Sequence, residues 1–320
     1  MKNTLTLAVA FIVTASASCA RDQIQVTGSS TVLPYATIVA EAFGENFEFP
    51  SPVVEGGGSG AGRKKLCEGV GENTVDIANS SSKMKDEEWA KCEETIGKVT
   101  EVRIGYDGIV FASNIGELGI KDLTVFQLYT ALHETSTAKL WSDINPALPE
   151  TEILVYIPGT KHGTREVFDV KVMEAGCKEA LGVEKLDDDQ KKACVQVRTD
   201  GASVDIDGDY TETLARLDAN KTALGVFGLS FYQNNTDKLE VATVSGVSPS
   251  VETISSGDYP ISRPLFFYVK NAHLDVIPGL REYVAFFVSD DMAGPEGALV
   301  QYGLVPDPEL TKTQEMVSGF

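Results

Sequence analysis

The chain has 320 residues, of which 42% are apolar, so it is long enough to fold as one large unit or two smaller ones. Its formal net charge of −20 excludes partners with dense negative charge, because such a field repels nucleic acid and anionic membranes. The same field repels an anionic ligand. An anion site in this chain therefore has to be made by local dipoles and individual cations.

The first twenty residues have the pattern of a cleavable secretory signal. Lys2 gives a positive start, Leu5 to Val13 is an apolar stretch, and small residues follow as far as Ala20. The apolar stretch is too short to span a bilayer, which needs roughly 20 apolar residues. We therefore expect residues 1–20 to be removed as a signal peptide and the mature protein to be exported to the periplasm.

The cysteines bear on lipid attachment and on disulfides. Ser16 stands where a lipoprotein signal has a large aliphatic residue, so we favour simple cleavage, with a lipid anchor at Cys19 as the alternative. The other four cysteines allow three pairings, and closure between sequence neighbours is favoured because the two pairs fall in different predicted lobes. The expected bonds are Cys67–Cys92 and Cys177–Cys194. Metal binding is the rival interpretation, but there is no Cys-x-x-Cys motif.

Strands and helices alternate along the first half of the chain. Short strands are expected at 24–26, 53–54 and 75–78, and helices at 35–43, 64–67 and 86–92. Residues 102–113 have the pattern of a longer strand that crosses between two lobes. This alternation predicts an α/β fold with largely parallel sheets.

The second half repeats the alternation. Helices are expected at 123–132, 165–173 and 213–217, and strands at 153–157 and 224–227. Residues 263–269 resemble the first crossing strand and are expected to be a second one. Residues 280–288 are expected to form a helix that packs back on the first lobe. The acid-rich run 205–209 lacks the glutamate of a calcium loop and is interpreted as a turn, with Asp209 capping the next helix.

Four polar turns each follow a predicted strand, and at least three of them open a helix. They are Gly28–Thr31, Gly56–Gly62, Asn79–Ser82 and Gly159–Thr164. The first N–H groups of a helix have no internal acceptor and lie at the positive end of its dipole, so several such helix starts together make an anion site.

Arg165 is the best-placed cation, because it stands in the first turn of a predicted helix. A guanidinium can hold a tetrahedral oxyanion through two parallel hydrogen bonds. An ion pair with Glu166 or Asp169 on the same helix is the alternative interpretation.

Eight stretches resemble the phosphate-binding proteins of bacterial phosphate ABC transporters, a type II solute-binding protein family. They are GSSTVLP (28–34), GGGSGAG (56–62), DIANSS (76–81), YDGIV (106–110), GTREVF (163–168), RTDGA (198–202), LGVFG (224–228) and YPISRPLFFYV (259–269). The match covers nearly the whole mature chain in the same order.

The resemblance implies a periplasmic binding protein fold. Each of its two α/β lobes has a mostly parallel sheet flanked by helices, two crossing strands join the lobes, and phosphate lies in the cleft between them. We place lobe I at residues 21–107 plus 263–320 and lobe II at residues 108–262.

The resemblance also implies a ligand set, carried by the turns. The residues are Ser30, Thr31 and the amide of Val32 in the first turn, Ser59 in the second, Ser81 in the third, and Gly163, Thr164 and Arg165 at the start of the second-lobe helix. The chain departs from the family at His162, where serine is usual. It also has Ser82 where many relatives carry a basic residue, and some relatives have a carboxylate at the position of Ser81.

Selectivity for phosphate depends on a proton. Monohydrogen phosphate carries one and sulfate at neutral pH carries none, so a buried acceptor favours phosphate and leaves sulfate facing a repelling group. Asp107 and a neutral His162 are the candidates for this acceptor. Asp107 as a hinge residue bonded to backbone is the alternative, and His162 either points to solvent or donates to phosphate.

These observations predict a monomeric receptor without catalysis, cofactor or metal. It closes on phosphate by hinge bending and then docks on the membrane permease subunits of an ABC transporter. Two alternatives stay open. One is the same fold binding sulfate, molybdate or another oxyanion. The other is a secreted phosphoester hydrolase, although the Gly-x-Ser-x-Gly nucleophile pattern fails at Ala61.

Overall fold

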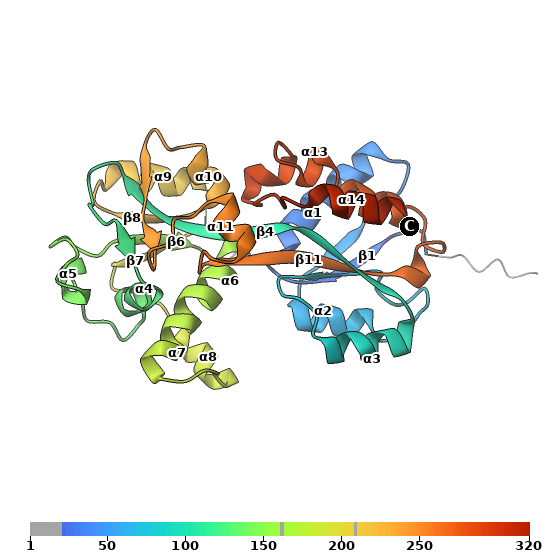
Figure 1. Cartoon of the computed structure of the whole chain (residues 1–320), viewed down its shortest axis with the longest axis horizontal. Helices are drawn as coiled ribbons and strands as arrows, with labels where there is room; N and C mark the ends of the chain where they lie inside the picture. The colour runs from blue at the N-terminus through green and yellow to red at the C-terminus, as the bar shows by residue number, and fades with distance from the viewer. Residues whose placement is uncertain (1–20, 161–162, 208–209) are drawn as a thin grey trace, which may run out of the picture.

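Two long strands join the two halves of the molecule. In the computed structural model, which describes residues 21–160, 163–207 and 210–320, β4 (Val99–Asn114) and β11 (Ser262–Lys270) run side by side through the waist between two lobes (Figure 1). Both were predicted as crossing strands, and both predictions are confirmed. The predicted signal segment, with Cys19, lies outside the described residues.

The remaining elements follow the predicted alternation. The other strands are β1 (Gln25–Gly28), β2 (Val53–Glu55), β3 (Ile77–Ser80), β5 (Asp122–Leu123), β6 (Val155–Pro158), β7 (Ser203–Ile206), β8 (Leu224–Gly228), β9 (Leu239–Val241) and β10 (Thr243–Val244). The first-lobe helices are α1 (Leu33–Asn46), α2 (Ser59–Leu66), α3 (Asp86–Ile96), α12 (Leu280–Phe287), α13 (Asp290–Ala293) and α14 (Leu310–Ser318). The second-lobe helices are α4 (Val125–Leu132), α5 (Trp141–Ile144), α6 (Gly163–Phe168), α7 (Ala175–Leu181), α8 (Asp188–Cys194), α9 (Tyr210–Ala219), α10 (Leu229–Gln233) and α11 (Val251–Ser256).

One curled sheet passes through both lobes. Its strand order is β2-β1-β3-β11-β4-β8-β6-β7, with β9 beside β4. Within the lobes the strands are parallel, since β1 pairs in parallel with β2 and β3, and β6 does so with β7 and β8. The crossing strands run antiparallel to each other and to their neighbours. The predicted fold class, two α/β lobes joined by two crossing strands, is confirmed.

Each lobe has its own hydrophobic core. In the first lobe α1 and α12 pack on one face of the sheet through buried aromatic rings, among them Phe43, Tyr283 and Phe287, while α2 and α3 cover the other face. A second cluster, which includes Trp141, Phe168 and Phe227, fills the other lobe. The expectation that helix 280–288 packs on the first lobe is confirmed. Separate cores let the lobes move as units about the strands between them.

Two local predictions need correction. Residues 203–206 form β7, which pairs with β6, whereas the end of this segment was interpreted as the start of a turn. Polar side chains occur both in exposed edge strands and in turns, so the local sequence pattern could not distinguish a strand from a turn here. The predicted helix 165–173 is divided into α6 and a π-helical segment, Asp169–Glu174, before α7. Asp209, the predicted cap, lies outside the described residues.

Both predicted disulfides are present. Cys67 is bonded to Cys92, 25 residues away, and Cys177 to Cys194, 17 residues away. Closing loops of this size restricts the unfolded chain and stabilises the fold by about 3 kcal/mol per bond.

We expect the double change Cys67→Ser with Cys92→Ser to lower the free energy of unfolding of the first lobe by about 3 kcal/mol, because the loop is no longer closed. Urea denaturation of this variant beside the unaltered protein measures the loss. An unchanged denaturation midpoint would show that the bond does not contribute to stability.

Candidate functional site

Three of the four predicted turns lie at one edge of the first-lobe sheet. The carboxyl ends of parallel β1, β2 and β3 meet there, and backbone bonds link the turns that follow them. The Ser29 amide donates to the Asn79 carbonyl at 2.9 Å, and the Gly58 amide donates to the Gly28 carbonyl at 2.8 Å. Gly28 has φ +136°, and a Cβ there would lie 2.2 Å from the Asn79 oxygen, so only glycine fits.

In the first turn, the Ser29 hydroxyl holds the backbone just before α1. Its oxygen accepts the amides of Thr31 at 3.2 Å and Val32 at 3.3 Å. The Val32 amide, predicted to bind the ligand, is therefore already engaged with Ser29 in this structure. Thr31 is fully buried, whereas Ser30 is exposed.

The second and third turns contact each other directly. The Ser81 amide donates to the Ser59 hydroxyl at 3.0 Å, and the two hydroxyl oxygens are 3.1 Å apart. Behind them, Arg63 donates to the Ser80 hydroxyl at 2.6 Å and to the Glu88 carboxylate at 2.9 Å. The two predicted serines are thus brought together and supported by a buried cation.

In the second lobe, Arg165 is buried at the start of α6 and already bonded. Its Nε donates to Asp169 at 2.8 Å, and its Nη1 donates to Asp205 at 2.5 Å and to the Pro158 carbonyl at 3.1 Å. The alternative interpretation, an ion pair with Asp169, is therefore realised. Nη2 has no partner among the residues that the structure describes, so it is the part of Arg165 left for a ligand. His162 lies outside the described residues.

One cluster joins the lobes: Thr31, Glu166 and Arg263. The Thr31 hydroxyl donates to Glu166 Oε2 at 2.6 Å and accepts a hydrogen bond from Arg263 Nη2. Arg263 Nη1 lies 3.5 Å from Glu166 Oε1. These contacts place the start of α6 against the first turn, beside β11.

The sequence analysis missed Arg263 and Glu166 as site residues. Arg263 lies on β11, whose following residues are almost all apolar and buried. A charged residue inside such a strand is costly to bury without a partner. The contrast between this charged residue and the apolar residues that follow it could have identified Arg263 from the sequence.

Asp107 is a fully buried carboxylate opposite Arg263 on the paired crossing strands. Neither of its oxygens has a hydrogen-bond partner within the described residues. Burial raises the pKa of Asp107 to about 6, while Arg263 lowers it and Glu166 raises it. Buried polar groups are normally hydrogen-bonded. An unbonded carboxylate at this position is a strong acceptor for a donor that enters between the lobes.

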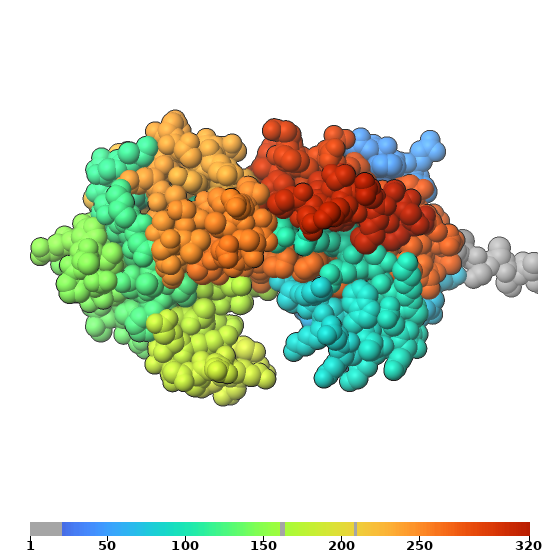
Figure 2. Space-filling view, viewed as in Figure 1, coloured from blue at the N-terminus to red at the C-terminus, as the bar shows by residue number. Residues whose placement is uncertain are grey.

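A hollow opens beneath β11 between α7–α8 and α2–α3 (Figure 2). A cavity of about 400 Å³ at the hinge is lined from both lobes and both crossing strands, with Lys83, Lys171, Tyr106 and Arg263 among its residues. Arg263 therefore belongs both to this cavity and to the Thr31 cluster.

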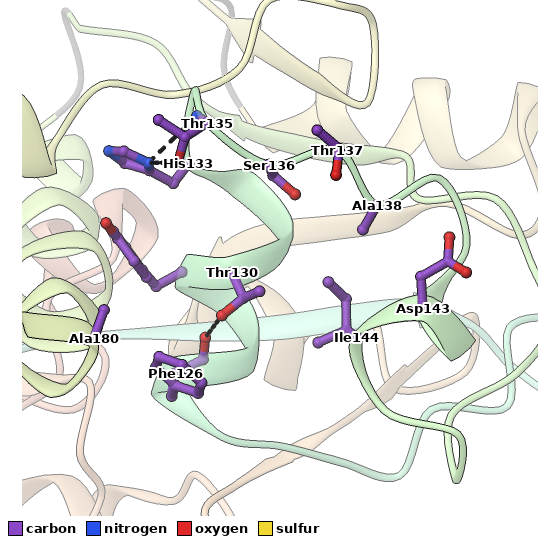
Figure 3. Close-up of a pocket in the computed structure, with 11 residues that line it drawn as sticks. Phe126, Thr130, His133, Thr135, Ser136, Thr137, Ala138, Asp143, Ile144 and Ala180 are labelled. Carbon is purple, nitrogen blue, oxygen red and sulfur yellow. Dashed lines mark hydrogen bonds between the residues drawn. The ribbon is translucent and has the colours of Figure 1, made fainter.

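A larger cavity, of about 710 Å³, lies in the second lobe around His133 (Figure 3). Several of its polar side chains are hydrogen-bonded within the protein. His133 Nδ1 is 2.8 Å from the Thr135 hydroxyl, and the Thr130 hydroxyl donates to the Phe126 carbonyl at 2.7 Å. None of the predicted site residues that the structure describes lines it. In the part of the chain that the structure describes, no three acidic, histidine or cysteine side chains gather as metal ligands.

Known proteins resemble the chain over most of its length. A model of the PBP superfamily domain matches residues 13–291. The phosphate-binding protein PstS of Staphylococcus haemolyticus (strain JCSC1435) is 31% identical over 296 residues, which is 90% of this chain and 82% of the relative. The PstS of Staphylococcus epidermidis (strain RP62A) is 29% identical over 294 residues, 90% of this chain and 80% of the relative.

Solved structures show the same fold. A possible phosphate binding protein from Planctomyces limnophilus DSM 3776 has 25% identity and a TM-score of 0.73, covering 93% of this chain and 97% of its own. An ABC-type phosphate transport receptor from Vibrio cholerae has 19% identity and a TM-score of 0.58. The match covers 88% of this chain and 99% of the receptor. No helix among the described residues is long and apolar enough to cross a membrane.

Proposed function

The chain belongs to the PBP superfamily and, within it, to the family of the PstS phosphate-binding proteins, and on that premise we propose that it captures inorganic phosphate between its lobes and delivers it to an ABC transporter. The observation that carries this proposal is the meeting of the first turn and the start of α6 at Arg263, opposite an unbonded, buried Asp107. Donors on the turns hold the phosphate oxygens, and Asp107 accepts the proton that distinguishes phosphate from sulfate.

The proposed ligand groups come from both lobes. They are Ser30, Thr31, Val32, Ser59, Ser81, Gly163, Thr164 and Arg165 as donors, with Asp107 as acceptor. The bonds between Thr31 and Glu166 and between Ser59 and Ser81 support this set, because the first joins the two lobes and the second joins two of the turns. Ligand entry replaces contacts of this kind with bonds to phosphate. We add Arg263 as the cation that spans Thr31 and the acidic side chains.

Hinge bending gives this site its mechanism. We place the boundaries at residues 21–107 plus 263–320 for lobe I and 108–262 for lobe II, so that the hinge falls within β4 and β11. The separate cores of the lobes support movement as units. Closure surrounds the ion with donors and removes water, which strengthens each charged hydrogen bond.

The role is that of a monomeric extracytoplasmic receptor rather than an enzyme. Capture and delivery need no bond to break, and the proposed site uses only hydrogen bonds and charge. The closed protein then docks on membrane permease subunits, which take up the phosphate. The strongly acidic surface disfavours nucleic acid as a partner.

Calorimetry with separate anions tests the proposal. We expect phosphate to bind with at least about 100-fold higher affinity than sulfate or molybdate, because only phosphate can donate a proton to Asp107. Tighter binding of sulfate would contradict the phosphate assignment. Release of product from a chromogenic phosphate monoester, abolished by a chelator, would instead favour the hydrolase alternative.

A further inference from the structure

The hinge cavity differs in charge from the rest of the molecule. Among the described residues, Lys83, Arg103, Lys171 and Arg263 line it, together with one acidic residue, Glu101. The whole chain, by contrast, carries a formal net charge of −20. A cleft lined by one sign of charge focuses the local field even when the overall charge has the opposite sign. This cavity is therefore a place where an anion is attracted to a molecule that otherwise repels it.

The cations in the cavity are not equally neutralised. Arg103 is bonded to Asp307 at 2.5 Å and to Glu309 at 3.1 Å, and Lys83 lies 3.7 Å from Glu101. Lys171, which is half-buried in the π-helical segment, forms no ion pair or hydrogen bond with any residue that the structure describes. Such segments occur often at functional sites.

The charges near Lys171 are mainly positive. Burial lowers the pKa of its ammonium group, and the nearby charges of Arg263 and Lys178 lower it further. Arg263 pairs with Glu166 at 3.5 Å, whereas no carboxylate among the described residues pairs with Lys171. An entering anion would relieve this repulsion.

We infer that the hinge cavity is a second, weaker anion site, in which Lys171 and Arg263 hold a phosphate-class oxyanion before it passes into the cleft. Arg263 connects the two places, since it lines the cavity and also bonds Thr31 in the cleft. A volume of about 400 Å³ accommodates the ion with bound water, because one water occupies about 30 Å³ of liquid. The inference rests on the proposed function. It adds a loading step, in which the anion binds in the hinge cavity before it enters the cleft.

The test is the rate of phosphate association in Lys171→Gln, measured by stopped-flow fluorescence with inorganic phosphate. We expect the association rate constant to fall about threefold at low salt, with the dissociation rate constant unchanged, because a rim charge acts mainly on encounter. The deficit should vanish at roughly 0.5 M salt, where screening removes the field.

Lys221→Gln is the matched control. It removes the same charge from the same lobe, but Lys221 is exposed, pairs with Asp218 at 3.0 Å and does not line the cavity, so its association rate should match that of the unaltered protein. Equal association rates for Lys171→Gln and the unaltered protein, or an equal loss in Lys221→Gln, would overturn the loading step alone. Failure of the unaltered protein to bind phosphate in the calorimeter would overturn both this inference and the proposed function.

Discussion

Arg263→Gln is expected to weaken phosphate binding at least 100-fold, which corresponds to about 3 kcal/mol. Arg263 donates to Thr31 and faces Glu166 at 3.5 Å, and it lies opposite the buried Asp107. Without the guanidinium, two carboxylates would face a doubly charged ligand with no cation between them. Calorimetry with phosphate at neutral pH measures the loss.

Arg198→Gln controls for the general cost of removing a buried arginine. Arg198 is as buried as Arg263 and pairs with Asp200 at 2.5 Å, away from the proposed ligand groups. Both variants are expected to be less stable in thermal denaturation, but only Arg263→Gln should lose affinity. If Arg263→Gln binds phosphate within about threefold of the unaltered protein, Arg263 is not part of the binding site.

Asp107→Asn is expected to reduce the preference for phosphate over sulfate by at least 100-fold. The carboxylate accepts the phosphate proton and repels sulfate, whereas an amide can donate to sulfate. Comparison of the two affinities by calorimetry tests this. A preference that survives the substitution would assign the acceptor role to another group, with His162 as the remaining candidate from the sequence.

The raised pKa of Asp107 adds a dependence on pH. Above about pH 6 the carboxylate is charged and accepts from phosphate, and below that value it is protonated and can donate to sulfate. Sulfate affinity of the unaltered protein should therefore rise as the pH falls through about 6. In Asp107→Asn, sulfate affinity should not change over this range.

The same pKa predicts an effect on stability that does not depend on ligand. The value in the folded protein, about 6, lies above the ordinary value of 3.8, so the folded chain binds this proton more tightly than the unfolded chain. The buried charge therefore destabilises the fold above about pH 6, by up to roughly 3 kcal/mol, and this cost disappears below pH 3.8. Asp107→Asn should raise the free energy of unfolding at about pH 7.5 and leave it unchanged at about pH 3.

Several features followed from the sequence because they depend on residues close together in the chain. Alternating apolar patterns predicted both crossing strands, and short loops between cysteines predicted Cys67–Cys92 and Cys177–Cys194. The turns at Gly28 and Ser59 were recognised because glycine and hydroxyl residues directly follow strands. Local pattern failed at β7, where a polar segment suits more than one structure, and in the predicted helix 165–173, which a π-helical segment divides.

The pairing of the acceptor with the cations of the site depended on tertiary structure. Thr31 and Glu166 are 135 residues apart, and Thr31 and Arg263 are 232 apart, so no local pattern relates them. Only the antiparallel pairing of β4 and β11 places Arg263 opposite Asp107, and only the packing of α6 against the first turn turns Glu166 toward Thr31. The sequence by itself determined most of the elements, both disulfides and the residue types at each turn. The tertiary structure decided which charges meet. Long-range pairing brings each buried charged group to its partner, and burial together with that partner sets its pKa.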